Sequence, residues 1–287
     1  MTALIKWKNH HIQDVEVNLL LHTLNERYGY DFTGYARASL KRRLLDLMSY
    51  FELEHLTQLI PIMLYDEAVA QTVINSISVP TSEFFRDPFV WAYLRKNIIP
   101  LLASFPRINI WQAGCGFGQE AYSLSILLHE AGLAKRSHIF CTDINPEFLN
   151  EAKKGSWAIR NLNSWQNYYE KSGGTGEFAD FFIEQKNSIA IRANYKQNVE
   201  FVQHNLVNDD VFKEVQFVMC RNVLLYFGEE LQNHVVSLFT RSLERGGYLL
   251  LGSGENILNL NEHHPRLELL DYSLQIYRKT MGITSHV

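Results

Sequence analysis

Residues 111–120 read WQAGCGFGQE, and this stretch decides the fold. The apolar run Ile108 to Ala113 predicts a strand that ends here, and the residues after Gly118 predict a helix. Glycines are needed where a strand turns sharply and the backbone must approach a ligand closely. Such turns also occur for purely structural reasons, and the spacing G-x-G-x-G differs from the dinucleotide fingerprint. The turn by itself predicts an α/β fold and leaves open whether it binds a ligand.

Strands and helices alternate around this turn, from about residue 79 to residue 287. Short apolar runs alternating with amphipathic helices are typical of a mostly parallel sheet covered on both faces. A final antiparallel pair is expected within Leu267 to Lys279. The other candidate strands are His138 to Asp143, Val199 to His204, Val215 to Cys220 and Gly247 to Gly252.

Two short motifs and one irregular stretch refine this prediction. Asp87-Pro88 and Asn145-Pro146 each predict a helix start, with a capping side chain followed by proline at the first helical position. The stretch from 157 to 197 is aromatic and polar and does not continue the alternation. We interpret it as an insertion on the rim of the sheet, with a loop at Gly173, Gly174 and Gly176.

Residues 1–78 have a different pattern and predict a small, all-helical domain. Apolar residues Val17, Leu20, Leu21 and Leu24 recur at helical spacing before Gly29. A second helix, about Tyr35 to Phe51, has an apolar face and a basic face, and two shorter helices are expected at 56–64 and 68–77. The basic side chains are Arg37, Lys41, Arg42 and Arg43. They could dock an acidic helix of a partner protein, although such charge runs are as often only a solvated face.

Composition excludes several classes of protein. The 287 residues are 46% hydrophobic and 20% charged, which suits a large globular core. A net charge of -4 and a pI near 6.3 argue against a nucleic-acid-binding protein. The cysteines Cys115, Cys141 and Cys220 have no metal-ligand spacing, so we expect buried reduced thiols and no metal site. No signal peptide or membrane span is apparent, which predicts a cytoplasmic protein, and a monomer is the default.

Asp143 adds a second functional signal. It ends the strand that follows the glycine turn, where a carboxylate can accept hydrogen bonds from both hydroxyls of a ribose. An acid at this position can also be a simple turn residue. The glycine turn and Asp143 together favour an adenosine-containing cofactor, either NAD or S-adenosylmethionine.

Further motifs carry a resemblance to one family. The elements FFRDP (84–88), AGCGFGQEAYS (113–123), CTDINP (141–146), HNL (204–206) and CRNVLLYF (220–227) occur in this order. Together with the segment YDFTGY (30–35) that enters the basic helix, they resemble the chemotaxis receptor methyltransferase (CheR) family over almost the whole chain. The resemblance implies a class I, Rossmann-like methyltransferase fold that binds S-adenosyl-L-methionine and releases S-adenosyl-L-homocysteine.

The resemblance also implies roles for individual residues. Arg221, Asn222 and Tyr226 would line the pocket where the methyl group is transferred. The cofactor-binding set would be Ser82, Arg86, Gly114, Gly116, Glu120, Asp143, Asn205, Leu206, Arg221 and Asn222. For Phe84, Phe85, Leu206 and Phe227, plain core packing is at least as good an interpretation. Many family members have asparagine where this chain has Pro80, which lacks an N–H, and threonine where it has Ser82.

The implied activity is methyl transfer to glutamate carboxylates of a chemoreceptor or other sensory protein. A glutamate is already ionised at neutral pH, so no general base is required. The alternatives are a nonenzymatic regulatory module that binds S-adenosylmethionine, a methyltransferase acting on a small molecule or RNA, and a nicotinamide-dependent dehydrogenase. Pro80 favours the first of these, whereas the motifs at Phe84 and Cys220 argue against the last.

Overall fold

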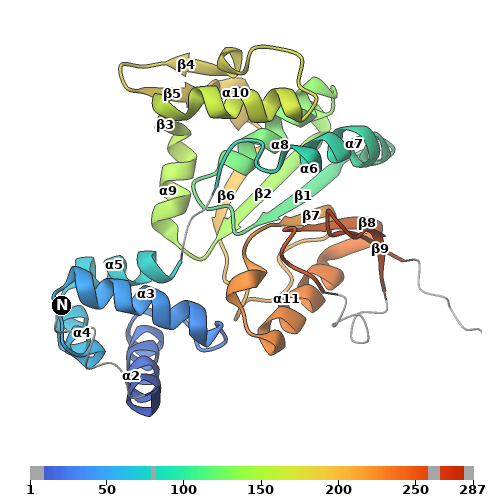
Figure 1. The fold of residues 1–287 in the computed structure, drawn as a ribbon. Coiled ribbons are helices and arrows are strands. Elements are labelled where there is room, and N and C mark those ends of the chain that lie inside the picture. The colour runs from blue at the N-terminus through green and yellow to red at the C-terminus, as the bar shows by residue number, and fades with distance from the viewer. Residues whose placement is uncertain (1–9, 79–81, 258–265, 281–287) are drawn as a thin grey trace, which may run out of the picture. The chain divides into compact units, whose positions relative to one another are not determined.

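The structure is a computed structural model that describes residues 10–78, 82–257 and 266–280. The chain forms two compact units (Figure 1). The first comprises Met1–Val79 and Leu225–Val235, and the second comprises Pro80–Leu224 and Val236–Val287. Pro80, where the sequence departs from the family pattern, lies outside the described residues.

The first unit is helical, as predicted. Its helices are α2 (His10–Tyr28), α3 (Arg37–Tyr50), the 3₁₀ turn η1 (Leu56–Gln58), α4 (Leu59–Tyr65), α5 (Glu67–Ile77) and the beginning of α11 (Glu229–Ser242). Val17, Leu20, Leu21 and Leu24 of α2 are fully buried, which confirms the apolar face read from their spacing. Asp66 caps α5 by accepting hydrogen bonds from the backbone N–H groups of Ala68 and Val69.

The predicted basic face of α3 was wrong for Arg43. This side chain is only 6% exposed, its guanidinium lies 4.3 Å from the centroid of the Tyr226 ring, and Nη1 donates to the Ile77 carbonyl at 2.5 Å. Arg43 follows Leu40 by three residues and precedes Leu47 by four, so helical periodicity places it on the buried face. Burial lowers its pKa.

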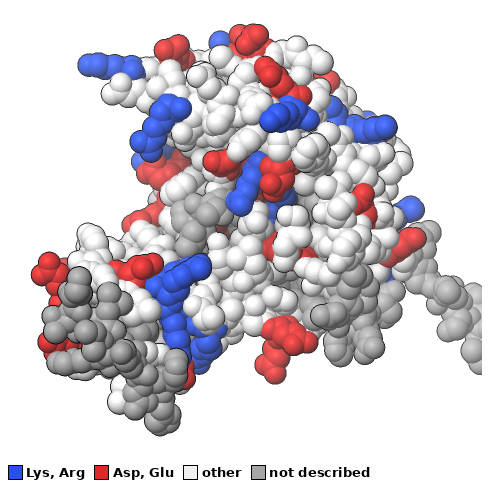
Figure 2. Space-filling model, viewed as in Figure 1, with Lys and Arg blue, Asp and Glu red and all other residues white. Residues whose placement is uncertain are grey.

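The other three basic residues of α3 remain at its surface. Arg37 and Arg42 are exposed, and Lys41 is half-buried with its Nζ 2.8 Å from Asp14 Oδ1. Figure 2 shows lysine and arginine side chains gathered over this helix. The exposed positive charge of α3 therefore belongs mainly to Arg37 and Arg42.

The second unit is built on a seven-stranded sheet in the order β6-β2-β1-β7-β8-β10-β9 (Figure 1). The strands are β1 (Ile108–Ala113), β2 (Ser137–Asp143), β6 (Val199–Gln203), β7 (Val215–Cys220), β8 (Leu243–Leu251), β9 (Leu267–Asp271) and β10 (Ile276–Lys279). The first five are parallel, and β9 and β10 form the antiparallel end. This confirms the class I methyltransferase fold. Every residue of β7 is buried, as expected for a central strand covered on both faces.

The connections complete the alternation. They are α6 (Pro88–Tyr93), the π-helical turn η2 (Leu94–Ile98), α7 (Ile99–Leu102), α8 (Gln119–Glu130), η3 (Ala134–Arg136), α9 (Pro146–Lys154), η7 (Leu224–Tyr226) and α11. The Asn145 side chain accepts from the Glu147 N–H at the start of α9, which confirms that cap. Strand β8 begins at Leu243, four residues before the expected Gly247, and its pairing with β7 shifts register near Val215. This irregularity lets the strand continue through Gly246 and Gly247.

The rim segment folds into a small structure of its own. It contains β3 (Ser156–Ala158), η4 (Ile159–Asn161), α10 (Leu162–Lys171), η5 (Phe178–Phe181), β4 (Phe182–Glu184), β5 (Ser188–Ile191) and η6 (Ala193–Lys196). Its three strands form an antiparallel sheet in the order β3-β5-β4. Its aromatic residues turn inward, because Trp165, Tyr169, Phe178 and Phe182 are all buried.

The order of the parallel strands locates the expected ligand crevice. From β1 the chain adds β2 and then β6 on one side, and later β7 and β8 on the other. The switch point thus lies between β1 and β7. Ligands in open α/β sheets bind beside the carboxyl ends of the strands at such a point.

Candidate functional site

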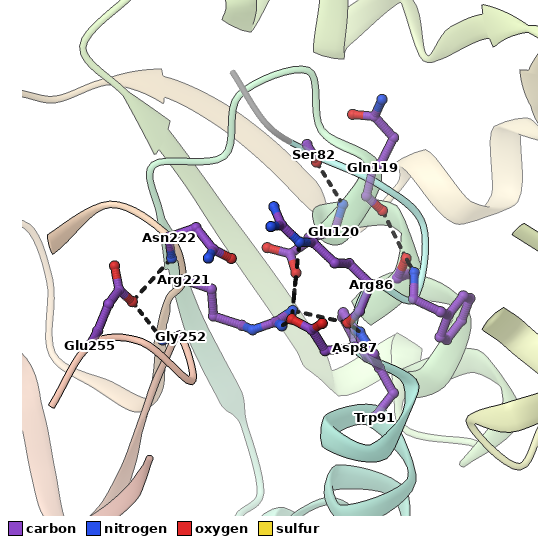
Figure 3. A network of polar contacts seen from close by, with 12 residues as sticks. Ser82, Arg86, Asp87, Trp91, Gln119, Glu120, Arg221, Asn222, Gly252 and Glu255 are labelled. Atoms are coloured by element: carbon purple, nitrogen blue, oxygen red, sulfur yellow. Dashed lines mark hydrogen bonds and ion pairs between the residues drawn. The ribbon is translucent and has the colours of Figure 1, made fainter. Parts of the chain in front are cut away.

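Arg221 lies at the centre of a network of charged groups at this switch point (Figure 3). It follows β7, and its side chain is completely buried. Nη1 contacts the Glu120 carboxylate in the first turn of α8, and Nη2 lies 2.5 Å from Asp87 Oδ2. Nη1 also donates to the Arg86 carbonyl at 3.3 Å. One guanidinium thereby connects the end of a central strand, a helix N-terminus and the loop before α6.

The charges in this network are strongly coupled. Burial raises the pKa of the Glu120 carboxyl, the positive charges of Arg221 and Arg86 lower it, and the neighbouring Asp87 and Glu255 raise it again. Three carboxylates therefore lie around two guanidinium groups. Arg221 Nε is buried without a hydrogen-bond partner. The site thus has an excess of negative charge around a buried guanidinium.

The FFRDP motif forms the loop on one side of this network. Phe84 and Phe85 are fully buried and make edge-to-face contacts with the aromatic residues of the rim segment, among them Trp165 and Phe178. Core packing is therefore the correct interpretation of both phenylalanines. They attach the loop to the rim segment and so position the two charged residues that follow them.

The helix start predicted at Asp87-Pro88 is confirmed, but the capping role predicted for the Asp87 side chain is wrong. Asp87 precedes α6 with Pro88 at the first helical position, but its side chain makes no capping hydrogen bond. The residue has a left-handed backbone, with φ of 54°, and its carboxylate binds Arg221 instead. The charged guanidinium attracts this carboxylate more strongly than the neutral N–H groups at the helix N-terminus would, so the tertiary contact prevails over the local one.

The glycine turn and Asp143 meet next to this network. Gly114 has φ of 71°, and a Cβ atom there would lie 2.3 Å from Val223 Cγ2. The Gly116 N–H donates to Asp143 Oδ2 at 2.9 Å, and the Asn145 N–H donates to Oδ1 at 3.0 Å. Burial raises the pKa of Asp143, although these N–H groups oppose the rise. The Ile144 N–H is a third backbone donor, and because a carboxylate has about four acceptor sites, Asp143 can still accept from a ligand hydroxyl.

Three further predicted residues surround the same edge of the sheet. Ser82 Oγ accepts from the Glu120 N–H at 3.4 Å (Figure 3), which brings the loop before α6 to the start of α8. Asn205 follows β6 and uses Oδ1 to accept from the Val207 N–H at 2.9 Å. Leu206 is 8% exposed. Asn205 and Leu206 follow β6. This strand is the neighbour of β2, which ends at Asp143.

Asn222 and Glu255 form a second contact at this site, of which the sequence analysis predicted only Asn222. Asn222 was predicted, and it has a left-handed backbone with φ of 61°. Glu255 was not predicted. Its Oε2 accepts from the Asn222 N–H at 3.0 Å and from the Gly252 N–H at 2.5 Å (Figure 3). The remaining predicted residue, Tyr226, belongs to the first unit, where its ring lies beneath Arg43.

The cysteines take no part in this chemistry. Cys115, Cys141 and Cys220 are unbridged and buried, as predicted, and burial raises the pKa of each thiol well above its ordinary value. Such thiols are poor nucleophiles. Over residues 10–78, 82–257 and 266–280, no group of three or more His, Cys, Asp or Glu side chains could hold a metal ion. No helix in those ranges has the length and apolar character that a membrane span requires.

Comparison with known proteins identifies the family. Residues 80–272 match the CheR methyltransferase, SAM binding domain, and residues 16–78 match the CheR methyltransferase, all-alpha domain. The chain belongs to the CheR methyltransferase family. The Cher3 protein of Pseudomonas putida (strain KT2440) is 37% identical over 267 residues, which are 93% of this chain and 97% of that protein. Chemotaxis protein methyltransferases of Listeria innocua and Listeria monocytogenes are 30% and 29% identical over 252 residues, 86% of this chain and 93% of each relative.

Membership in the CheR family confirms the predicted enzyme class and its cofactor, S-adenosylmethionine. The residues at the switch point fit this molecule. Asp143 retains acceptor capacity for a ribose, and the negatively charged network suits a ligand with a sulfonium and an ammonium group. A neutral or anionic ligand would gain less from the same charges. The dehydrogenase alternative is thereby excluded.

Proposed function

We propose that this CheR family member methylates glutamate side chains of a chemoreceptor protein. The observation that carries the proposal is the buried Arg221, which holds Glu120 and Asp87 together beside the glycine turn. S-adenosylmethionine, when bound, supplies an activated methyl group on a sulfonium. The work of the protein is to place the two reactants in line and to exclude water, which can supply roughly 7 to 11 kcal/mol of the barrier.

The cofactor would be held along the carboxyl edge of the sheet. Asp143 would accept from the ribose hydroxyls, and Asn205 and Leu206 would flank the adenine. Gly114 and Gly116 let the backbone approach the ligand because both have left-handed φ values, 71° and 50°. The methionine end would lie towards Ser82, Arg86 and Glu120.

Arg221 and Asn222 would border the methyl group, with different tasks. Both terminal nitrogens of Arg221 already contact carboxylates, so this guanidinium arranges the acids. The Asn222 amide is the better group to orient the substrate carboxylate. A neutral amide is also suited to this role because it does not weaken the nucleophile as a strong ion pair would. Tyr226 belongs to the first unit, and we assign it no role in this pocket.

The nucleophile needs no general base. A glutamate side chain with a reference pKa near ~4.3 is ionised at neutral pH. Bound S-adenosylmethionine would supply its methyl group to a carboxylate oxygen, and the electron pair of the broken carbon–sulfur bond would remain on sulfur. The products are a glutamate methyl ester and S-adenosylhomocysteine.

Receptor docking is proposed on α3, through its exposed charges. Arg37 and Arg42 are exposed, and Lys41 adds a charge that Asp14 partly neutralises. These residues suit an acidic helical segment that carries the target glutamates. We further propose that the enzyme acts as a monomer in the cytoplasm.

The test is a transfer assay with methyl-labelled S-adenosylmethionine and candidate chemoreceptors. We expect label on protein that alkaline treatment releases as methanol, as methyl esters do. The matched control is Glu200→Gln, which removes an exposed carboxylate on β6 that pairs with His138 and should leave transfer unchanged. Tight cofactor binding without label in protein, RNA or small molecules would instead favour a nonenzymatic regulator.

A further inference from the structure

The backbone of Asn222 adopts a conformation that asparagine does not favour by itself. Its φ of 61° lies in the left-handed region, directly after Arg221 and the end of β7. Asparagine tolerates this region better than most residues, but only glycine adopts it without cost. An interaction with the surrounding structure must therefore hold the residue in place.

Glu255 supplies that interaction. Its Oε2 accepts from the Asn222 N–H at 3.0 Å and from the Gly252 N–H at 2.5 Å (Figure 3). The two N–H groups follow β7 and β8, which are neighbours in the sheet. One carboxylate oxygen thus connects the ends of two strands at the ligand-binding edge.

The surroundings of Glu255 are arranged around this contact. A Cβ atom on Gly252 would lie 2.6 Å from Glu255 Oε2 and 2.9 Å from the Asn222 nitrogen, so only glycine fits there. Glu255 itself is 4% exposed, and its charge raises the pKa of Glu120. A buried charge near another carboxylate is unfavourable, and hydrogen bonds from backbone N–H groups are the compensation seen here.

We propose that Glu255 is a positioning residue, which fixes the backbone of Asn222 so that its side chain faces the reacting groups. The proposal rests on the function proposed above, because that function gives Asn222 its role. Glu255 acts through Asn222 and not by contact with substrate. Substitution of Glu255 should therefore lower ligand affinity and turnover when residue 222 is asparagine, with its side chain and its strained backbone. It should have little effect when the Asn222 side chain is absent.

The experiment is a double-mutant cycle read out by S-adenosylhomocysteine affinity in isothermal titration calorimetry. Glu255→Ala should weaken binding roughly tenfold, and Glu255→Gln, whose amide oxygen can still accept, should recover most of it. Asn222→Gly removes the side chain and adopts positive φ without cost. In the Asn222→Gly background, Glu255→Ala should change affinity by less than about threefold.

Glu244→Ala is the matched control. Glu244 of β8 accepts from Gln216 Nε2 of β7, so it connects the same two strands near their other ends. It should alter stability and leave affinity unchanged. Equal losses from Glu255→Ala in both backgrounds, or an equal loss from Glu244→Ala, would overturn the proposal.

Hydrogen exchange of the ligand-free protein separates this proposal from the proposed function. The Asn222 amide should exchange faster in Glu255→Ala and close to the wild-type rate in Glu255→Gln, whatever the enzyme methylates. Unchanged protection of that amide in Glu255→Ala would refute the positioning role. Absence of methyl transfer by the wild type would refute the function alone.

Discussion

Replacing Arg221 by methionine should destabilise the second unit severely, because it leaves a buried carboxylate unpaired. The side chains of Arg221 and Glu120 are 0% and 8% exposed, so Glu120 cannot regain water when its partner is lost. Breaking such a buried pair costs about 3 to 5 kcal/mol. Asp87 binds the same guanidinium but is 47% exposed, and Asp87→Asn should cost about 1 kcal/mol or less.

The pH dependence follows from Glu120. Burial raises its pKa above the ordinary value, and Arg221 opposes that rise. Without Arg221 the pKa rises further, so the folded variant takes up a proton at a pH where unfolded Glu120 is still ionised. The penalty applies above the folded-state pKa and disappears as the pH falls through it. The deficit of Arg221→Met should therefore be smaller at about pH 6 than at about pH 8.

Urea unfolding followed by tryptophan fluorescence reports mainly on the second unit, since four of the five tryptophans belong to it: Trp91, Trp111, Trp157 and Trp165. Adding Glu120→Gln to Arg221→Met removes the unpaired charge and should restore at least half of the lost stability. A deficit below about 1 kcal/mol for Arg221→Met, or no recovery in the double variant, would refute the reasoning.

Three further predictions concern the cofactor and the receptor. Asp143→Asn should weaken S-adenosylhomocysteine binding by about 10- to 100-fold in calorimetry, because hydrogen bonds to a charged acceptor contribute roughly 1.5 to 3 kcal/mol. Unchanged affinity would show that Asp143 does not bind the ribose. Gly114→Ala should lower the free energy of unfolding by more than about 1 kcal/mol, since its φ is 71° and its Cβ would meet Val223, and Val223→Ala should restore part of the loss in urea titrations. Substitution of both Arg37 and Arg42 by glutamate should raise the KM for the receptor roughly tenfold at low salt without changing cofactor affinity. A wild-type KM that does not depend on salt would contradict docking by these charges.

The sheet and the cofactor edge could be predicted from sequence because their signals are local. Segments of six or seven residues, rich in apolar side chains, form β1, β2 and β7, and the glycines after Ala113 mark the turn. Asn145 was correctly predicted as a cap, because its side chain accepts from the Glu147 N–H at the start of α9. In these places the local preference and the tertiary structure agree.

The wrong or missed predictions concern residues whose side-chain contacts are made with a partner far away in the sequence. Asp87 looks like a cap until Arg221, 134 residues later, is placed beside it. Arg43 looks like part of a charged face until Tyr226 covers it. Glu255 lies in a loop after β8 without any motif, 33 residues from Asn222, so nothing in its neighbourhood indicates its contact. The rim sheet was not foreseen because its strands are three or four residues long, too short for an alternating pattern.

The most direct test of the central proposal is peptide mass spectrometry of a purified chemoreceptor cytoplasmic domain after incubation with the enzyme and S-adenosylmethionine. We predict the mass of one methyl group on glutamate side chains of acidic helical segments, lost after mild alkali and reduced with Asp143→Asn. Methylation confined to lysine, arginine or another alkali-stable position, or an unmodified receptor beside an enzyme that binds the cofactor, would contradict the proposed function.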